Sequence, residues 1–445
     1  EKGPRRFVGR RRKEEERQGD SEDQSDPVRA ALERKEGKAV VPRARGQAGR
    51  IVHSVPEEIL KDEELGRAIG ELLPSNYNFE IHKTVWRIRQ AKVGTVALQL
   101  PEGLQMFACP LADIFQRFCA VDVIILGDVT YGACCIDDLT ARALGAELLV
   151  HYGHSCLVPI DTCVMPVLYV FVEIEIDSDH LLRSILHNFE SSQRLLLVST
   201  IQFVGSLHKI RPQLQEHYQS IEVPQARPLS KGEVLGCTAP QVKAEEVDAM
   251  IYVGDGRFHL EAMMIANPSI PAFRYDPYSK VMSAEAYSHE QMRYNRKKAI
   301  EEAAMASSIG IILGTLGRQG NPNILTHIKA SLEAAGKHYL VILLSEITPA
   351  KLAMFQDVGA WVQVACPRLS IDWGHLFHVP LLSSYELQVA LKTAEWQEVY
   401  PMDFYAQTAG SWGNYPNNQR AKERRQAEEA RSSGTDLKRA DQLKS

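Results

Sequence analysis

Short runs of apolar residues recur along the chain from residue 95 to residue 364, and longer segments with helical spacing separate them. Runs of about four to six residues that are apolar throughout are typical of strands buried on both faces of a sheet. Strands that alternate with helices predict right-handed βαβ units and therefore parallel sheets. The predicted strands are Thr95–Leu100, Val121–Leu126, Glu147–Val150, Arg194–Val198, Ala249–Val253, Ile309–Leu313, Tyr339–Leu344 and Ala360–Val364.

The same order of a strand and a loop that bears glycine or cysteine occurs three times, at intervals of roughly 100 residues. One matching set comprises 96–103, 196–205 and 311–320, and a second set comprises 145–154, 247–256 and 359–368. We therefore predict an α/β fold with three duplicated parallel-sheet subdomains in a pseudo-threefold arrangement. Ligands of open α/β sheets bind beyond the carboxyl ends of the strands, so three such ends are expected to surround one central site.

Composition sets the limits of these subdomains. The chain has 445 residues, of which 44% are hydrophobic and 24% are charged, as in globular proteins. The predicted subdomains are 55–188, which includes an N-terminal helix, then 189–295 and 296–410. The flanking segments 1–54 and 411–445 are rich in charged residues, Gln, Ser and Gly, and we predict that both are disordered.

The net charge of −5 is unevenly distributed, because both flanking segments are basic and the middle is acidic. A basic arm is able to contact nucleic acid or a ribosome-bound partner, but a solvated tail of mixed charge is the favoured interpretation. The acidic middle argues against nucleic acid as the main ligand. No apolar run approaches the roughly 18 residues of a membrane span, and the charged start does not resemble a secretory signal.

The eight cysteines fall into two groups. A chain with this apolar content and no secretory signal is expected in a reducing compartment, where cysteines are free thiols or metal ligands. Cys109 and Cys119 lie in a predicted helix and are interpreted as buried structural thiols. Cys156 and Cys163 flank a loop, where a core position and a site position both stay open.

Cys134, Cys237 and Cys366 differ, because each is predicted to lie at a junction between a strand and a helix. One cysteine per repeat at the functional end of a sheet suits three thiolates on one metal centre. Three thiolates and an open fourth position favour a catalytic iron–sulfur cluster over structural zinc, which usually has four protein ligands. No CxxC motif occurs, so the spacing alone is a weak signal.

Seven motifs extend this pattern along the chain. They lie at 128–138, 151–155, 235–238, 254–259, 275–278, 316–322 and 366–372. In sequence and order they resemble the diphthamide-synthesis family, and the similarity is strongest to its eukaryotic subunit 1. The resemblance covers roughly residues 76–401 and is highly specific.

The resemblance implies three duplicated α/β domains that each give one cysteine to a 4Fe–4S cluster. S-adenosylmethionine binds the unique iron in this family, and an electron from the cluster cleaves the bond between its sulfur and the γ-carbon of the methionine moiety. The resulting 3-amino-3-carboxypropyl radical adds to imidazole C2 of a histidine in translation elongation factor 2, as the first step of diphthamide biosynthesis. Carried over by position, the cluster ligands are Cys134, Cys237 and Cys366, and Cys135 is interpreted as packing.

Four further residues are candidates for roles around this site. Arg318 and Arg368 lie in loops where a guanidinium would match the carboxylate of S-adenosylmethionine, and a structural ion pair is the alternative for each. His151 and His154 are candidates for assisting the loss of the C2 proton. A buried histidine with a structural role is at least as well supported for both.

Amides and glycines complete the candidate set. Gln202 and Gln319 occupy matching repeat loops and are candidates for contacts with the ribose or the carboxylate. Gly236, Gly317 and Gly320 would permit a close approach of the cofactor to the backbone.

The resemblance also implies partners: a paralogous subunit 2 in a heterodimer, elongation factor 2 as the protein substrate, and electron-donor proteins. No direct nucleic-acid target and no membrane are expected, and the cytoplasm is the predicted location, with the nucleus as a second one. Two alternatives stay open. One is a non-catalytic scaffold or reductive subunit of the same heterodimer, which the complete cysteine triple disfavours. The other is a 4Fe–4S dehydratase similar to quinolinate synthase, which the seven motifs disfavour.

Overall fold

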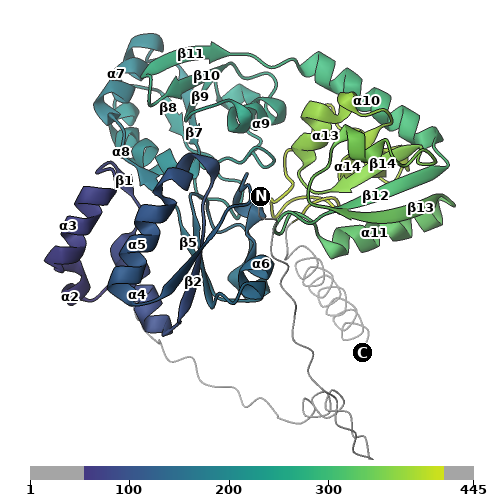
Figure 1. The fold of residues 1–445 in the computed structure, drawn as a ribbon. Coiled ribbons are helices and arrows are strands. Elements are labelled where there is room, and N and C mark those ends of the chain that lie inside the picture. The colour runs from purple at the N-terminus through teal and green to yellow at the C-terminus, as the bar shows by residue number, and fades with distance from the viewer. Residues whose placement is uncertain (1–54, 415–445) are drawn as a thin grey trace, which may run out of the picture. The chain divides into compact units, whose positions relative to one another are not determined.

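Three parallel sheets organise the chain. The computed structural model describes residues 55–414, and every structural statement below concerns these residues. The predicted disordered tails therefore lie outside the described residues, apart from 411–414. Figure 1 shows each sheet with its own helices, in blue, teal and yellow-green along the chain.

All three sheets have the same strand order. In each, the first strand along the chain is central, the second lies on one side of it, and the third and fourth lie on the other. The orders are β3-β2-β4-β5, β8-β7-β9-β10 and β13-β12-β14-β15, and every neighbouring pair in them is parallel. One topology repeated three times confirms the predicted triplicated α/β fold, while the pseudo-threefold arrangement stays a prediction.

The first sheet consists of β2 (Thr95–Gln99), β3 (Asp122–Leu126), β4 (Leu148–Tyr152) and β5 (Val167–Val170). Its helices are α2 (Glu57–Leu60), α3 (Glu63–Leu72), α4 (Ile81–Ala91), α5 (Ala108–Cys119) and α6 (Asp138–Ala143). A two-stranded antiparallel ribbon joins β1 (Tyr77–Asn78) to β6 (Glu173–Ile174). All five residues of β4 are buried, as the continuous apolar run predicts.

The second sheet consists of β7 (Arg194–Ser199), β8 (Ser220–Glu222), β9 (Ala249–Val253) and β10 (Ala272–Asp276), and β11 (Val281–Glu285) adds an antiparallel strand beside β10. Its helices are α7 (Ser178–Asn188), α8 (Val204–Gln215) and α9 (Phe258–Ala266). Side chains from α7 and α8 form an apolar core with β7 and β9.

The third sheet consists of β12 (Ser308–Gly314), β13 (His338–Leu344), β14 (Ala360–Val364) and β15 (Leu381–Leu382). Its helices are α10 (His289–Met305), α11 (Pro322–Ala334), α12 (Pro349–Leu352), α13 (Pro367–Trp373) and α14 (Ser384–Ala390). The expected boundary between residues 295 and 296 falls inside α10. In that helix, buried Arg296 pairs with buried Glu386 of α14 at 2.6 Å, so α10 belongs with the third sheet.

The backbone register shows which loops are equivalent. In each sheet, the residue just before the third strand donates a backbone hydrogen bond to the carbonyl of a residue at the start of the central strand. The three donor and acceptor pairs are Glu147 and Thr95, Asp248 and Arg194, and Gly359 and Ser308. Seven residues on, His154, Asp255 and Cys366 therefore occupy matching positions. The second matching set of the sequence analysis was shifted by one residue per copy, because uniformly apolar strands contain nothing that marks their register.

Candidate metal centre

Cys134 lies in a tight turn between β3 and α6. The turn is a short 3-10 helix, Ala133–Cys135, in which the backbone N–H of Cys135 donates to the carbonyl of Gly132 at 2.9 Å. The side chain of Asp137 then caps α6 by accepting from the backbone N–H of Thr140 at 3.0 Å. The predicted position of Cys134 between a strand and a helix is confirmed.

Cys237 lies in a loop without a regular strand, so the predicted strand end before it is wrong. Leu235 and Thr238 exchange backbone hydrogen bonds with each other, which turns the segment back on itself instead of extending a sheet. Residues from the end of the described chain hold this loop. The backbone N–H of Phe404 donates to the carbonyl of Cys237 at 3.3 Å, and that of Tyr405 donates to Oγ1 of Thr238 at 2.9 Å.

Cys366 directly precedes α13 and follows β14, which confirms its predicted junction. Its place in the sheet differs from that of the other two cysteines. Cys134 and Cys237 follow the second strand of their sheets, whereas Cys366 follows a third strand. The three cysteines are therefore one per sheet, as predicted, but they do not occupy equivalent positions of the repeat.

The three thiols lie close enough to raise one another's pKa. A hydrogen bond with Cys135, burial and the neighbouring Cys237 and Cys366 thiols raise the pKa of Cys134 well above its usual value. Burial and the neighbouring Cys366 raise the pKa of Cys237 to about 12. Tyr405 lies among them, because its buried hydroxyl is hydrogen-bonded with Cys134 and interacts with the other two thiols. Residues distant in sequence thus form one sulfur-rich site.

The chemistry of this donor set fits an iron–sulfur cluster. No group of three or more His, Cys, Asp or Glu side chains within residues 55–414 is arranged to hold one metal ion. An iron–sulfur cluster does not require convergence on one point, because separate iron atoms each accept one thiolate. Soft sulfur donors without a carboxylate among them are the ligands that such clusters prefer.

The neighbouring Cys135 is buried and has a different environment from Cys134. Nε2 of Gln319 lies 3.3 Å from the Cys135 sulfur, which makes Gln319 a contact of this cysteine. The hydrogen bond from Cys134, together with backbone N–H groups and Gln319, outweighs burial and lowers the pKa of Cys135 to about 7. The choice of Cys134 as the first ligand stays a prediction.

Arg318 connects the third sheet to the Cys134 turn. Its backbone N–H donates to the carbonyl of Cys134 at 2.8 Å, and its guanidinium forms two hydrogen bonds of 2.7 and 2.6 Å with buried Asp138. Gly317 precedes it with a φ of +54°, and a Cβ there would lie 2.4 Å from the backbone of Cys135. Arg318 therefore forms a structural ion pair, which is the alternative given for it above. Gly317 permits close contact between its loop and the Cys134 turn.

Arg368 is 2% exposed and is likewise fully paired. It forms ion pairs with Glu261 at 2.6 Å and with Asp372 at 2.9 Å, and Nη1 donates to the carbonyls of Gly236 and Phe258. Both predicted cofactor-binding arginines thus have occupied guanidinium groups. Binding of a carboxylate by either would require it to leave these partners.

The other predicted cofactor contacts also have partners within the protein. A Cβ on Gly236 would lie 2.0 Å from the ring of Phe258, and one on Gly320 would lie 2.2 Å from the carbonyl of Gly314. Gln202 donates to the carbonyl of Gly153. These glycines are explained by packing, and cofactor binding by any of them stays untested.

The two predicted histidines form a hydrogen-bonded chain that starts at Gln99. Nδ1 of His151 lies 2.9 Å from Oε1 of Gln99, and Nε2 of His151 lies 3.1 Å from Nδ1 of His154. His151 is fully buried and His154 is partly exposed. His259 of α9 lies near His154, since it helps to lower the pKa of His154.

Sequence reasoning missed Gln99, Asp138, His259 and Tyr405. Asp138 and His259 belong to quoted motifs, so their positions were available, but their partners lie on other subdomains. Gln99 is a polar residue within an apolar strand run, which is the kind of exception that marks a buried function. Tyr405 had no motif of its own. Cys109 and Cys156 are exposed, so the interpretation of Cys109 as a buried thiol was wrong.

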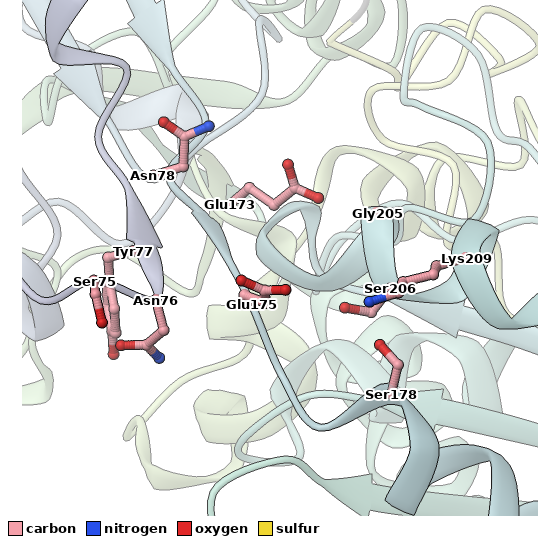
Figure 2. A pocket seen from close by; sticks show the side chains of 10 residues that line it. All are labelled: Ser75, Asn76, Tyr77, Asn78, Glu173, Glu175, Ser178, Gly205, Ser206 and Lys209. Atoms are coloured by element: carbon pink, nitrogen blue, oxygen red, sulfur yellow. The ribbon is translucent and has the colours of Figure 1, made fainter.

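A separate cavity of about 440 Å³ lies between the β1–β6 ribbon and the start of α8. Figure 2 shows Glu173, Glu175 and Lys209 among the side chains that line it. None of the predicted site residues lines this cavity. The sulfur-rich site is therefore distinct from it.

Comparison with known proteins identifies the family of this chain. Residues 100–401 match the family described as "Putative diphthamide synthesis protein". The chain belongs to the diphthamide synthesis family. Cys134, Cys237 and Cys366 all lie inside the matched range, whereas Tyr405 lies just outside it.

Relatives within this family are similar over most of their length. A protein of Schizosaccharomyces pombe named 2-(3-amino-3-carboxypropyl)histidine synthase subunit 1 is 54% identical, over 93% of this chain and 94% of its own. Proteins of that name from Gallus gallus and Homo sapiens are each 57% identical. They match 86% and 83% of this chain, and 94% and 84% of their own lengths.

Solved structures support the fold. A crystal structure of Dph2 from Pyrococcus horikoshii with a 4Fe-4S cluster superimposes with a TM-score of 0.62 at 24% identity, over 74% of this chain and 94% of the other. A second Dph2 structure from the same organism has a TM-score of 0.60. Within residues 55–414, no helix combines the length and the apolar character needed to cross a bilayer.

Proposed function

We propose that this chain is the catalytic subunit of a 2-(3-amino-3-carboxypropyl)histidine synthase. It transfers a 3-amino-3-carboxypropyl group from S-adenosylmethionine to imidazole C2 of a histidine in translation elongation factor 2. The observation that carries the proposal is that Cys134, Cys237 and Cys366 lie near one another in a partly buried site. A non-catalytic scaffold has no need of three neighbouring thiols.

In this proposal the three thiolates hold a 4Fe–4S cluster. Bound there, the cluster would supply the electron that cleaves the bond between sulfur and the γ-carbon of S-adenosylmethionine. Burial raises the pKa of the Cys237 and Cys366 thiols, so cluster binding replaces protons on these sulfurs. The hydroxyl of Tyr405 is hydrogen-bonded with Cys134, and contacts of this kind tune a cluster's reduction potential.

The two arginines hold the cysteine loops in place in this proposal. Arg318 holds the Cys134 turn through its backbone, and Arg368 holds the Gly236 carbonyl beside Cys237. We infer that they keep the Cys134 turn and the Cys237 loop in fixed positions. Positioning of this kind is a large part of enzymatic rate enhancement.

The proposed partners are a paralogous second subunit, elongation factor 2 and electron-donor proteins, with the reaction taking place in the cytoplasm. The relatives' shared name, subunit 1, supports an assembly of more than one subunit. The relatives' names also weigh against the alternative of a small-molecule dehydratase.

Anaerobic reconstitution tests the proposal. The complex of this chain with its paralogue is incubated with reductant, elongation factor 2 and S-adenosylmethionine labelled in the aminocarboxypropyl group. We expect label on the factor and release of methylthioadenosine. Formation of 5′-deoxyadenosine, or label that stays on S-adenosylmethionine, contradicts the proposed reaction.

Single substitutions test the ligand set. Cys134→Ala, Cys237→Ala and Cys366→Ala are each expected to abolish the visible absorbance of the cluster and the transfer of label. The matched control is Cys109→Ala, because Cys109 is an exposed thiol on α5. Full activity after any one of the three substitutions overturns the assignment of that cysteine. Loss of activity in Cys135→Ala, together with retained activity in Cys134→Ala, would make Cys135 the first cluster ligand in place of Cys134.

A further inference from the structure

Gln99 fixes the proton positions of two histidines. It is the last residue of β2 and is buried. Its Nε2 donates to the carbonyl of Cys135 at 2.9 Å, and its Oε1 accepts from the backbone N–H of Asp137 at 3.1 Å. A carbonyl only accepts and a backbone N–H only donates, so the orientation of the Gln99 amide is determined.

The next partner of this amide is His151. Oε1 of Gln99 lies 2.9 Å from Nδ1 of His151, and an amide oxygen can only accept, so this nitrogen carries a hydrogen. Burial, and after it the nearby His154, keep the pKa of His151 well below its usual value, so the ring is neutral and its Nε2 is an acceptor. Nε2 of His151 lies 3.1 Å from Nδ1 of His154, which must therefore donate.

The proton pattern leaves His154 with a lone pair on Nε2. The side-chain hydrogen bond of His154 within residues 55–414 uses Nδ1, so Nε2 has no side-chain partner there. Burial and the nearby His259 outweigh the Tyr152 carbonyl and lower the pKa of His154 to about 4, so the ring is unprotonated at neutral pH. His154 is partly exposed whereas His151 is fully buried, so a bound molecule can reach the end of the chain but not its middle.

The free end lies on the side of the cysteines. His259, at the start of α9, interacts with His154, and Arg368 interacts with His259 and with the Cys237 thiol. At its other end the chain is attached to the carbonyl of Cys135, next to Cys134. The hydrogen-bonded histidines therefore connect two parts of the sulfur-rich site.

We propose that His154 is the general base that accepts the C2 proton of the target histidine, and that His151 and Gln99 are positioning residues that keep its Nε2 unprotonated. This inference rests on the proposed function and names a residue, an atom and a tautomer within it. It also separates the roles of His151 and His154, which the motif alone does not do.

The step balances as follows. A carbon–carbon bond forms between the γ-carbon radical and imidazole C2, and the C2–H bond of the adduct then breaks. The proton goes to Nε2 of His154. Before this bond breaks, the unpaired electron of the adduct returns to the iron–sulfur cluster that supplied it for cleavage, and both electrons of the C2–H bond then stay in the ring and restore its aromaticity. The sum is S-adenosylmethionine and histidine giving methylthioadenosine, modified histidine and one proton.

A base of low pKa suits this proton. A hydrogen on the tetrahedral carbon of an oxidised ring is far more acidic than an imidazolium, because its loss restores aromaticity. Availability of the lone pair therefore matters more than basicity. Burial of His154 favours rapid release of the accepted proton, since burial disfavours the charged imidazolium.

The first experiment measures how much of the cleaved S-adenosylmethionine ends on the substrate. His154→Ala in the complete complex is expected to form methylthioadenosine while the fraction transferred to elongation factor 2 falls about 10²-fold, the lower end of the roughly 10²–10⁴-fold effect of general bases. Added imidazole is expected to restore part of this fraction. Deuterium at C2 of the target histidine is expected to slow transfer more in His154→Ala than in the unsubstituted complex.

His151→Phe and the control His180→Gln sharpen the result. His151→Phe is expected to lower the transferred fraction less than His154→Ala does, without rescue by imidazole, because the base is still present but poorly placed. His180 lies on α7, and its Nδ1 is 2.8 Å from the hydroxyl of Tyr275. Its substitution is expected to leave the fraction transferred to elongation factor 2 unchanged. An unchanged transferred fraction in His154→Ala overturns the inference, whereas failure of the unsubstituted complex to transfer label overturns the proposed function instead.

A second measurement does not depend on activity. Diethyl pyrocarbonate acylates unprotonated imidazole nitrogens that lack a hydrogen bond, and peptide mass mapping of the full chain locates the product. We expect acylation at His154 and none at His151, whose two nitrogens are both engaged. Preferential acylation of His151 contradicts the assigned tautomers.

Discussion

Two junctions between subdomains hold the loops that bear Cys134 and Cys237, and the contacts at the two junctions are of different kinds. At the first junction, the loop 317–319 of the third sheet contacts the Cys134 turn, and a backbone N–H provides the hydrogen bond to the turn. At the second junction, Arg368 contacts the Cys237 loop with its side chain. The first combines close contact between two backbones with the Arg318–Asp138 ion pair, and the second depends on the buried guanidinium of Arg368.

The difference has an energetic consequence. The Arg318–Asp138 pair of the first junction contains a carboxylate side chain with no exposed surface, while the carboxylates of Glu261 and Asp372 at the second junction retain about a quarter and a fifth of theirs. Without Arg318, the first junction contains an unpaired carboxylate that water does not reach. Without Arg368, the second junction contains two carboxylates that are still partly exposed to water. The first junction should be the more sensitive of the two.

The largest effect is expected for Arg318→Met. It leaves the Asp138 carboxylate buried without its counter-charge, which costs about 3–5 kcal/mol in comparable cases. The midpoint of urea unfolding measures this loss at neutral pH. An unfolding midpoint equal to that of the unsubstituted chain would refute the importance of the pair.

The pH dependence of the same variant follows from the pKa of Asp138. Burial alone would raise this pKa, but the hydrogen bonds from Arg318 and Val164 and the charge of Arg318 outweigh burial and hold it below its usual 3.8. The pair therefore contributes its full stability above pH 3.8 and loses it as the pH falls through the lower, folded-state pKa. We expect the gap between Arg318→Met and the unsubstituted chain to shrink in acid and not in alkali.

Gly317→Ala is expected to cost about 3 kcal/mol, from the left-handed backbone conformation and from collision with the Cys135 backbone. Gly336→Ala is the matched control, because Gly336 has a φ of +63° and nothing within 4 Å of its Cβ direction. It should cost only the conformational part, about 1–2 kcal/mol. Equal loss of cluster absorbance in both variants would show that the contact with the Cys134 turn is unimportant.

Arg368→Met is expected to destabilise the chain by about 2 kcal/mol, because its charged hydrogen bonds are lost while both carboxylates keep access to water. Loading of the cluster should fall, since the Gly236 carbonyl beside Cys237 loses its donor. Urea unfolding and visible absorbance measure the two effects. A larger destabilisation than that of Arg318→Met would reverse the ranking of the junctions.

The smallest effect is expected for Gly236→Ala, about 1 kcal/mol. The added methyl meets the ring of Phe258, which is 43% exposed, and does not meet a fixed backbone. In a Phe258→Ala background the same change should cost nothing measurable in the unfolding midpoint. The same destabilisation in the Phe258→Ala background would show that the added methyl does not act through the Phe258 ring.

The central strands and the site were predictable to different degrees. The strands β9 (Ala249–Val253) and β14 (Ala360–Val364) were predicted to the residue, because both are buried on both faces and read as unbroken apolar runs. The short edge strands β8 and β15 were missed, since two or three residues carry no period. The expected tail from residue 411 was wrong for its first residues, because Asn414 is buried and donates to the Gln319 carbonyl at 2.9 Å.

The cysteines themselves were predictable and their surroundings were not. A cysteine at the end of a strand is visible in the sequence, but the pairing of Asp138 with Arg318 spans 180 residues and depends on how two subdomains meet. The same holds for Tyr405 and Cys134. Local patterns give elements, whereas contacts between subdomains depend on packing that no local pattern encodes.

The hydrogen bonds that the segment 402–405 makes with the Cys237 loop set an order of events during synthesis of the protein. The carbonyl of Met402 and the N–H groups of Phe404 and Tyr405 complete the loop, and these residues leave the ribosome after the strands of all three sheets. The first two sheets are able to fold while translation continues, as N-terminal domains generally do. The Cys237 loop reaches its final conformation only after residues 402–405 have emerged, so insertion of the proposed cluster has to follow synthesis of the chain through these residues.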